Sequence, residues 1–364
     1  MKISELEGVL NEMAPLAYAE SYDNVGLLVG NPNQEIQGIL VCHDALESVI
    51  DEAIAKKCNA VVCFHPILFS GLKKITGKNY VERAVLKAIK NDVAILSVHT
   101  ALDNHKEGVN KILCNALGLE NTKVLLPKTQ YIEKLVAFVP KENIEEVKQA
   151  LFNVGAGSLG NYSNCSFSSQ GIGTFKGNEN SNPIVGQKNQ LESVTETKLE
   201  VTYEKHLQSI VLKALFKSHP YEEVAYEIYT LQNKLQDVGL GMIGEFKNEK
   251  TENQFLEDVK KTLQCGIIRH STFLDKPIKR VAVLGGSGAD AIGAAKAQKA
   301  DAYITADLKY HNFFEAENKL LLADVGHFES ERFTKNYICD YLKEKITNFA
   351  IILSEENTNP VQYF

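Results

Sequence analysis

The sequence predicts an α/β protein whose two-part core, with parallel-type sheets and covering helices, is interrupted by an inserted ferredoxin-like α+β domain. Three observations predict it. Strand-like and helix-like segments alternate in the first third of the chain, and they alternate again in the last third. Between them the composition shifts toward glycine, asparagine and serine. We therefore expect a discontinuous core, residues 1–130 and 232–364, and an inserted domain, residues 131–231.

In the first third, buried-strand patterns are separated by amphipathic helical patterns. The first helix shows the typical spacing, with apolar Val49, Ile50, Ala53 and Ile54 on one face. The short links between these segments predict a parallel sheet with covering helices. The expected order is strand 38–44, helix 45–58, strand 60–64, helix 80–92 and strand 93–100.

The middle segment has a different order of elements. A strand and then a helix are expected over 134–155, and a glycine-rich stretch over 155–175 predicts turns and small strands. Residues 191–204 alternate as a strand does, and 206–218 are helical in pattern. A strand–helix–strand–strand–helix–strand order is that of a ferredoxin-like module.

The last third returns to the alternating pattern. Residues 280–300 are expected to form a strand, a glycine turn and a helix. The amphipathic pattern of residues 329–346 predicts one long helix. The remaining segments are expected to be strand 301–307, helix 310–320, strand 320–327 and strand 349–354.

Composition narrows the class of protein. The 364 residues are 44% hydrophobic and 23% charged, which is ordinary for a soluble globular protein. A net charge of −7 argues against a broad nucleic-acid-binding surface. No apolar run approaches the length of a membrane helix, and the acidic N-terminus does not resemble a signal peptide. Seven cysteines without C-x-x-C spacing favour reduced thiols, so we expect a cytoplasmic protein.

Imidazoles and carboxylates gather at the ends of the predicted strands. His43 and Asp44 end one strand, and His65 ends the next. The third is followed by His99 and Asp103; in the last third, the strand ends are followed by Asp307, His311, His327 and Glu331. Sheets of this type form their ligand sites at the carboxyl ends of strands. Neutral imidazole and carboxylate bind Zn²⁺, Fe²⁺ and Mn²⁺, so the pattern predicts a metal site.

Two pairs are spaced four residues apart, which places both members on one face of a helix. They are His99 with Asp103 and His327 with Glu331. Each spacing alone is weak, because a capping or surface histidine would explain it equally well. Side chains on four successive strand ends are much harder to explain in that way.

Several stretches together carry a family resemblance. They occur in this order: SYDNVGLLVG, HPILF, HTALD, GGSG, TADLKYH and DVGHFESER. The chain resembles the NIF-three-like family, also called GTP cyclohydrolase 1 type 2 homologues, over nearly its whole length. Residues 219–229 and 155–167 resemble the family's inserted domain, which has a PII- or CutA-like fold. The resemblance implies a ring-shaped homohexamer with a two-metal site in each subunit.

The resemblance also implies ligands. His65, Asp103, His327 and Glu331 match the family's metal-binding positions, with Glu331 placed to bridge two ions. The chain departs from the pattern at Phe64, where the family has a first histidine. Phenylalanine cannot bind a metal, so binding of a second ion is expected to be weak or absent unless another side chain substitutes. We therefore expect one or two divalent ions (Zn, Fe or Mn) per subunit.

Two residues near Phe64 have side chains that can bind a metal in its place. His43, at the end of the adjacent strand, is the candidate; the alternative is a partly buried histidine hydrogen-bonded to backbone. Cys63 is a poorer candidate, because adjacent strand residues point to opposite faces. His99 and His311 are candidates for proton transfer or for support of the ligands, and Asp44 and Asp307 could serve likewise.

Two further patterns receive structural explanations. His219 in the middle segment is expected to stabilise a turn. Gly286, Gly288 and Ala291 match G-x-G-x-x-A after a strand, the shape of a dinucleotide fingerprint. A tight strand-to-helix turn explains the glycines without a cofactor, and the alternative left open is a substrate phosphate at the N-terminus of that helix.

Two functions remain open. The first is a metal-dependent, hydrolase-like enzyme acting on a small molecule, and the resemblance implies GTP cyclohydrolase activity, although nothing in the sequence identifies guanine. The second is a metal-binding regulatory or metal-handling protein without turnover, whose inserted domain senses a ligand or gates the ring.

Overall fold

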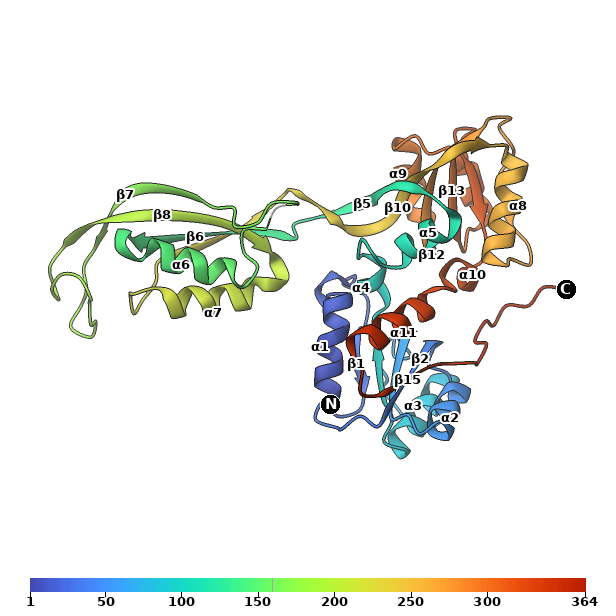
Figure 1. Ribbon diagram of the computed structural model, residues 1–364, viewed down its shortest axis with the longest axis horizontal. Helices are drawn as coiled ribbons and strands as arrows, with labels where there is room; N and C mark the ends of the chain where they lie inside the picture. Colours follow the sequence, from blue (N-terminus) through green and yellow to red (C-terminus); the bar gives the residue numbers. More distant parts are fainter. Residues whose placement is uncertain (159) are drawn as a thin grey trace. The chain divides into compact units, whose positions relative to one another are not determined.

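The computed structural model describes residues 1–158 and 160–364 (Figure 1). The chain divides into two compact units, one of Met1–Pro127 with Gln236–Phe364 and one of Lys128–Leu235. Leu159, in the glycine-rich stretch expected to form turns and small strands, lies outside the described residues. No helix among the described residues has the length and apolar character needed to cross a bilayer.

The first unit contains a five-stranded sheet in the order β1-β4-β3-β2-β15. Its strands are β1 (Gly26–Val29), β2 (Gly38–Asp44), β3 (Ala60–His65), β4 (Ala94–Ser97) and β15 (Ala350–Leu353). The last four are mutually parallel, whereas β1 runs antiparallel to β4. The sheet is therefore mixed, because a strand that precedes the alternating segments adds to its edge.

Helices cover both faces of this sheet. On one face lie α1 (Ile3–Met13) and α11 (Thr334–Lys345), and on the other α2 (Glu47–Ala55) and α3 (Tyr80–Lys90). Strand alternation divides the buried residues between the two faces. Phe64 packs with the α1 and α11 side chains, and Cys63 packs with those of α2 and α3.

A six-stranded sheet, in the order β11-β14-β13-β12-β10-β5, completes this unit. Strands β12, β13 and β14 are parallel, and β10 and β11 are antiparallel to their neighbours. Helices α5 and α8 pack on one face, and α9 with the 3₁₀ helix η5 on the other. The bounds are β5 (Glu120–Thr129), β10 (Lys234–Lys250), β11 (Arg269–His270), β12 (Ile278–Ser287), β13 (Ala302–Ala306), β14 (Leu321–Asp324), α5 (Val109–Leu117), α8 (Glu252–Leu263), α9 (Ile292–Ala297) and η5 (Tyr310–Ala316).

Two expected helices differ from the sequence prediction. The helix expected over 310–320 is the shorter η5. The long helix expected over 329–346 is two helices, α10 (His327–Glu331) and α11, separated at Arg332 and Phe333. The reason is that α10 contacts β12 and β13 of the six-stranded sheet, whereas α11 contacts β2 and β15 of the five-stranded one. One straight helix could not follow both surfaces.

The second unit is a four-stranded antiparallel sheet in the order β7-β8-β6-β9. Helices α6 and α7 cover one face and form its core with β6 and β8 (Figure 1). The element order is strand, helix, strand, strand, helix, strand. The bounds are β6 (Ile132–Pro140), α6 (Ile144–Phe152), β7 (Phe167–Phe175), β8 (Glu192–Glu204), α7 (Gln208–Ser218) and β9 (Tyr226–Leu231).

Candidate metal centre

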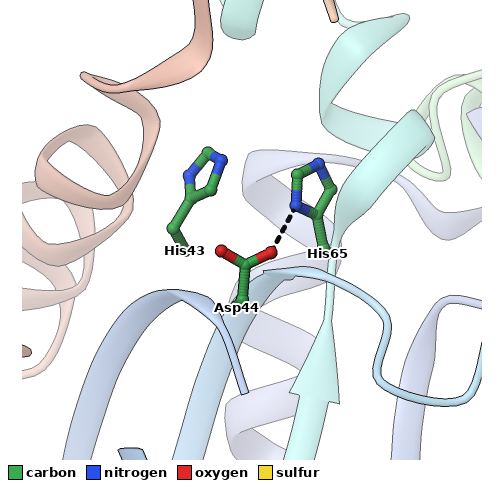
Figure 2. Close-up of side chains that lie close together, drawn as sticks. All are labelled: His43, Asp44 and His65. Atoms are coloured by element: carbon green, nitrogen blue, oxygen red, sulfur yellow. Dashed lines mark hydrogen bonds and ion pairs between the residues drawn. The ribbon is translucent and has the colours of Figure 1, made fainter. Parts of the chain in front are cut away.

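The carboxyl ends of β2 and β3 bring three polar side chains together. Asp44 on β2 is the register partner of His65 on β3, and His43 precedes Asp44. Figure 2 shows both imidazoles beside the Asp44 carboxylate. One ligand atom from each of these three residues lies within 4.8 Å of those from the other two. The parallel pairing of two strands thus assembles half of the candidate centre.

Helix α10 supplies the other half. Glu331 is only 4% exposed, and its Oε2 faces the Nε2 atoms of three imidazoles. The distances are 3.4 Å to His43, 3.2 Å to His65 and 3.3 Å to His327. His65, His327 and Glu331 form a second set whose ligand atoms all lie within 4.8 Å of one another. One buried carboxylate oxygen is therefore the point on which three histidines converge.

Glycines at the end of β12 make room for this carboxylate. Gly286 has φ of +70°, and a Cβ atom there would lie 2.4 Å from Glu331 Oε1. At Gly285 a Cβ atom would lie 3.3 Å from Glu331 Cγ. Any larger side chain at residue 286 would displace the carboxylate. This packing, together with the turn, explains the glycine pattern that resembled a dinucleotide fingerprint.

Each of the two best-placed histidines is held by its own aspartate. His65 Nδ1 lies 2.8 Å from Asp44 Oδ1, and His327 Nδ1 lies 2.7 Å from Asp307 Oδ2. An ionised carboxylate only accepts, so Nδ1 donates in both pairs. Nε2 is then directed at Glu331 in each case. Metal-binding histidines characteristically donate their other ring N–H to a carboxylate, which orients the ring.

A third pair of this kind involves His99, the first residue of α4 (His99–Asp103). Its Nδ1 lies 2.8 Å from Asp23 Oδ1, and Asp23 Oδ2 accepts from the backbone N–H of Thr100 at 3.1 Å. The His99 ring centroid is 5.2 Å from that of His65. Reasoning on single residues missed Asp23. The available signal was its position within the SYDNVGLLVG stretch.

Asp103, at the end of α4, lies within the electrostatic influence of Glu331. Its Oδ1 is buried and has no hydrogen-bond partner among the described residues. Burial and the charge of Glu331 raise the pKa of Asp103 well above its usual range. Two neighbouring buried carboxylates are unfavourable unless a cation lies nearby, because their charges repel each other in a poorly solvated site.

The residues at 43 and 64 are both buried beside the cluster. Phe64 is fully buried, with its ring centroid 5.4 Å from that of His43 and 4.8 Å from that of His65. His43 is 3% exposed, and neither ring nitrogen has a hydrogen-bond partner among the described residues. The alternative of a histidine bonded to backbone is therefore not what the structure contains. The Cys63 thiol faces away and donates to the carbonyl of Leu96 at 3.2 Å.

The structure does not bring His311 to the cluster. His311 lies on η5, is exposed, and has ring contacts with Tyr310 and Phe314. It follows its strand by five residues, so the chain has already left the sheet edge before reaching it. The sequence candidates that do gather are His43, His65, His327 and Glu331, with Asp103 and His99 beside them.

A cavity of about 380 Å³ lies beside the cluster. Residues of the C-terminal segment form part of its wall, and Thr358 Oγ1 donates to Asp44 Oδ2. No pattern in the sequence indicated that this segment reaches the site. The lining residues are His43, Asp44, His65, Ile267, Arg269, Asp307, Asp324, Gly326, His327, Phe328, Glu329, Asn359, Pro360, Val361 and Tyr363.

We expect metal binding to release protons at neutral pH. Burial opposes a charged His65, but its hydrogen bond to Asp44 and its ion pair with Glu331 prevail and raise its pKa to about 9. The hydrogen bond of His327 to Asp307 and its ion pair with Glu331 likewise overcome burial and raise its pKa to about 11. Both rings are protonated at pH 7 without metal, whereas metals bind neutral imidazole, so about two protons should leave.

Calorimetric titration with Zn²⁺ or Mn²⁺ in two buffers of different ionisation enthalpy measures this release. Because the pKa values are raised, protons compete with the metal most strongly at low pH, and the metal affinity should rise as the pH increases from 6 to 9. A binding enthalpy that is the same in both buffers, after correction for metal–buffer complexes, would contradict the prediction.

Comparison with known proteins places these observations in a family. The family model Duf34/NIF3 (NGG1p interacting factor 3) matches residues 1–360. The chain is 40% identical over 361 residues to a Bacillus subtilis protein named GTP cyclohydrolase 1 type 2 homolog, covering 98% of this chain and 96% of that one. It is 36% identical to the protein of the same name from Staphylococcus epidermidis, with all of both chains covered.

Solved structures agree with this assignment. A Bacillus cereus protein related to NIF3 is 39% identical and superposes with a TM-score of 0.86, covering 100% of this chain and 99% of that one. Staphylococcus aureus protein SA1388 is 28% identical with a TM-score of 0.79, at the same coverage. With a family model that spans almost the whole sequence and relatives above 30% identity over their full length, the chain belongs to the Duf34/NIF3 family.

Proposed function

We propose that this protein binds one or two divalent metal ions at the candidate centre and uses them to hydrolyse a small-molecule substrate. The observation that carries the proposal is the convergence of three imidazole Nε2 atoms on the buried Oε2 of Glu331. Aspartates fix two of these rings from behind. Such an arrangement orients imidazole and carboxylate groups in the way that metal ligands characteristically need.

The unpartnered groups of the site fit a metal. Asp103 Oδ1 and both ring nitrogens of His43 are buried without hydrogen-bond partners among the residues described, and Glu331 Oε2 faces imidazole nitrogens at 3.2 to 3.4 Å. Leaving a buried polar atom unpaired costs roughly 1–3 kcal/mol. A divalent cation would satisfy several of these atoms at once. His65, His327, Glu331 and Asp103 would hold it, and we propose His43 as the substitute for the histidine absent at residue 64.

A divalent ion bound here would supply Lewis acidity that activates water and polarises the substrate near neutral pH. Protein side chains would orient the metal ligands and transfer protons. Asp44 and Asp307 keep the Nδ1 proton on His65 and His327, so that both Nε2 atoms stay available. His99, held by Asp23, is the proposed group for moving a proton near the reacting atoms. His311 has no geometric support for such a role.

The proposed substrate is a small molecule that enters the 380 Å³ cavity beside the cluster. Cavities of roughly 300–1,000 Å³ suit ligands of drug-like size. The relatives' names direct the first test to GTP. Arg269 lines the cavity, but it is paired with Asp324, so it is not a free phosphate-binding group.

Elemental analysis of the purified protein, followed by a nucleotide screen with and without chelator, tests the proposal. We expect bound Zn, Fe or Mn, and hydrolysis that stops on chelation and returns with metal. The Glu331→Gln variant, expressed in the same strain and purified in the same way, is the control for activity from contaminating enzymes. Metal-dependent turnover shown equally by that variant would belong to a contaminant.

The rival proposal is a metal-binding regulatory or metal-handling protein without turnover. The order of elements in the second unit supports it, because a PII/CutA-like inserted domain, proposed over residues 131–231, suits a sensor or gate. Bound metal without hydrolysis of any nucleotide tested would favour this rival. In both cases we propose a cytoplasmic homohexamer, which sedimentation or light scattering can test. All seven cysteines are free thiols, which suits a reducing compartment.

Because residue 64 is phenylalanine, the two metal positions should differ in affinity. We expect titration of the wild type with Zn²⁺ or Mn²⁺ to show a tight event and a weaker one. His43→Ala should weaken the weaker event by at least about tenfold, as losing a metal's supporting group typically does. Phe64→His should tighten it, because residue 64 already lies against His43 and His65.

The matched control is His311→Ala, which removes a histidine outside the cluster and should change neither event. Circular dichroism should accompany Phe64→His, since this substitution puts a polar ring into a buried position. Two equal tight events that survive in His43→Ala would show that His43 is not a ligand and that Phe64 leaves no deficit.

A further inference from the structure

The second unit contains a cleft of about 590 Å³. It lies over strands β7 and β8, and it is closed by the loop that joins them and by the segment after α7. Gly171 on β7 and Glu196 on β8 are direct register partners, so both face the cleft. The lining residues are Phe138, Ser169–Gly177, Ser181, Pro183–Val185, Glu196, Lys198, Tyr221–Glu223 and Ala225.

Glu196 provides a buried carboxylate without a counter-charge. It is 8% exposed, and among the described residues no basic side chain forms an ion pair with it. Lys198 lines the same cleft but pairs with Glu200 at 2.7 Å, and Lys176 is exposed. A buried carboxylate of this kind is costly unless a cation or a strong donor meets it.

His219 does not fill that role, although it is close enough for Glu196 to influence its charge. Its Nε2 donates to the carbonyl of Phe138 at 3.0 Å, and its Nδ1 accepts from the backbone N–H of Tyr221 at 3.1 Å. Both ring nitrogens are therefore committed in the neutral form. Burial lowers the pKa of His219, which keeps the ring uncharged. The histidine stabilises the turn, as the sequence predicts.

A tyrosine hydroxyl lies beside the carboxylate. The Tyr221 hydroxyl oxygen is buried and has no hydrogen-bond partner among the residues described. Burial and the charge of Glu196 raise the pKa of Tyr221 to about 12. The polar end of the cleft therefore holds a carboxylate that pairs with no basic side chain among the described residues, beside a neutral hydroxyl.

Much of the remaining lining of the cleft is apolar, and the cleft has room. A Cβ atom at Gly171 would meet no atom within 4 Å, so the strand surface there is open space. At Gly173 a Cβ atom would lie 2.2 Å from Glu196 Oε2, so this glycine lets the carboxylate lie across β7. Apolar side chains form the walls: Phe138, Phe175, Ile184 and Val185.

We propose that this cleft binds a small organic cation, an amine attached to an apolar ring. The ammonium group would pair with Glu196 and donate to the Tyr221 hydroxyl oxygen, and the ring would lie over Gly171 between the apolar walls. The volume is in the range of about 300–1,000 Å³ that suits such ligands. This site is separate from the metal centre and does not depend on the hydrolytic function.

Tryptamine is a suitable probe because the protein contains no tryptophan. Excitation at wavelengths where tyrosine does not absorb reports the indole of the probe alone. We expect a saturable blue shift of indole emission in wild-type protein. Indole-3-acetate carries the same ring with a negative charge and should bind at least tenfold more weakly.

Three variants locate the binding. Glu196→Gln keeps the shape and should abolish the preference for tryptamine over indole-3-acetate. Gly171→Leu fills the open space and should prevent saturable binding of either compound. Ser168→Leu adds the same side chain to β7 on the opposite face, where it does not line the cleft, and should bind tryptamine as the wild type does.

Glu331→Gln should also bind tryptamine normally, which excludes attraction of the amine to the metal centre. The proposal is overturned if wild-type protein shows no saturable tryptamine binding below about 1 mM, an affinity worth only about 4 kcal/mol. It is equally overturned if indole-3-acetate binds as well as tryptamine, or if a folded Glu196→Gln protein keeps the full preference. The charge comparison in the wild type stands even if Gly171→Leu does not fold.

Discussion

Replacing Glu331 with glutamine should remove most of the bound metal, with a loss of affinity of about a hundredfold or more. The substitution keeps the volume of the side chain but removes its charge. Oε2 of Glu331 faces His43, His65 and His327 together. The amide that replaces it either donates toward those nitrogens or accepts weakly, so every metal position that uses this oxygen is affected.

A matched control is available two residues away on the same helix. Glu329 is as buried as Glu331, at 5% against 4% exposed, but its Oε1 accepts from Asn359. Glu329→Gln should retain the metal. Elemental analysis and chelator competition on both purified variants measure the difference. Full metal occupancy in a folded Glu331→Gln protein would overturn the assignment of this carboxylate as the shared ligand.

Replacing Asp44 with asparagine should weaken metal binding by about tenfold to a hundredfold, although Asp44 stands behind the histidine. Asparagine can still accept from His65 Nδ1, but without the charge that makes this bond strong. The pKa of His65, raised to about 9 in the native protein, should fall toward its ordinary value. The pH at which protons stop competing with the metal should then fall as well.

That change in pH dependence is expected if Asp44 orients His65 and stabilises its charge. A general loss of protein stability would not produce it. Metal affinity should be measured from pH 6 to 9 in both proteins, together with the imidazole titration by NMR. Asp51→Asn is the control, because Asp51 forms a surface ion pair with Lys87 and lies outside the cluster. An unchanged His65 pKa in Asp44→Asn would show that Asp44 does not govern the charge of this ring.

Local patterns in the sequence were sufficient for much of the fold. Residues 38–44 and 60–64 were expected to be strands because their apolar runs have the length and flanking turns of buried strands, and β2 and β3 occupy them. The amphipathic pattern of residues 329–346 is continuous and predicts one helix. Its break at Arg332 depends on which sheet each half contacts, and the periodicity of one segment carries no information about that.

Some residues of the candidate site could likewise be predicted from the sequence, and others could not. His65, His327 and Glu331 could be singled out because each follows a predicted strand, and the carboxyl ends of parallel strands meet at one edge. His311 met the same criterion, yet η5 carries it away from the edge. Asp23 met no criterion, because its loop reaches His99 only once β1 has paired with β4, the strand that ends just before His99.

By itself the sequence determined the family, the order of most strands and helices, and the residue types that can bind a metal. Only the tertiary structure decided that three imidazoles face one oxygen of Glu331, that Gly286 leaves space for that carboxylate, and that Thr358 of the C-terminal segment reaches Asp44. The physical reason is the separation along the chain between the residues that interact. Strand and helix patterns arise from interactions a few residues apart, whereas these contacts join segments separated by tens to hundreds of residues, whose approach is set by packing of the whole unit.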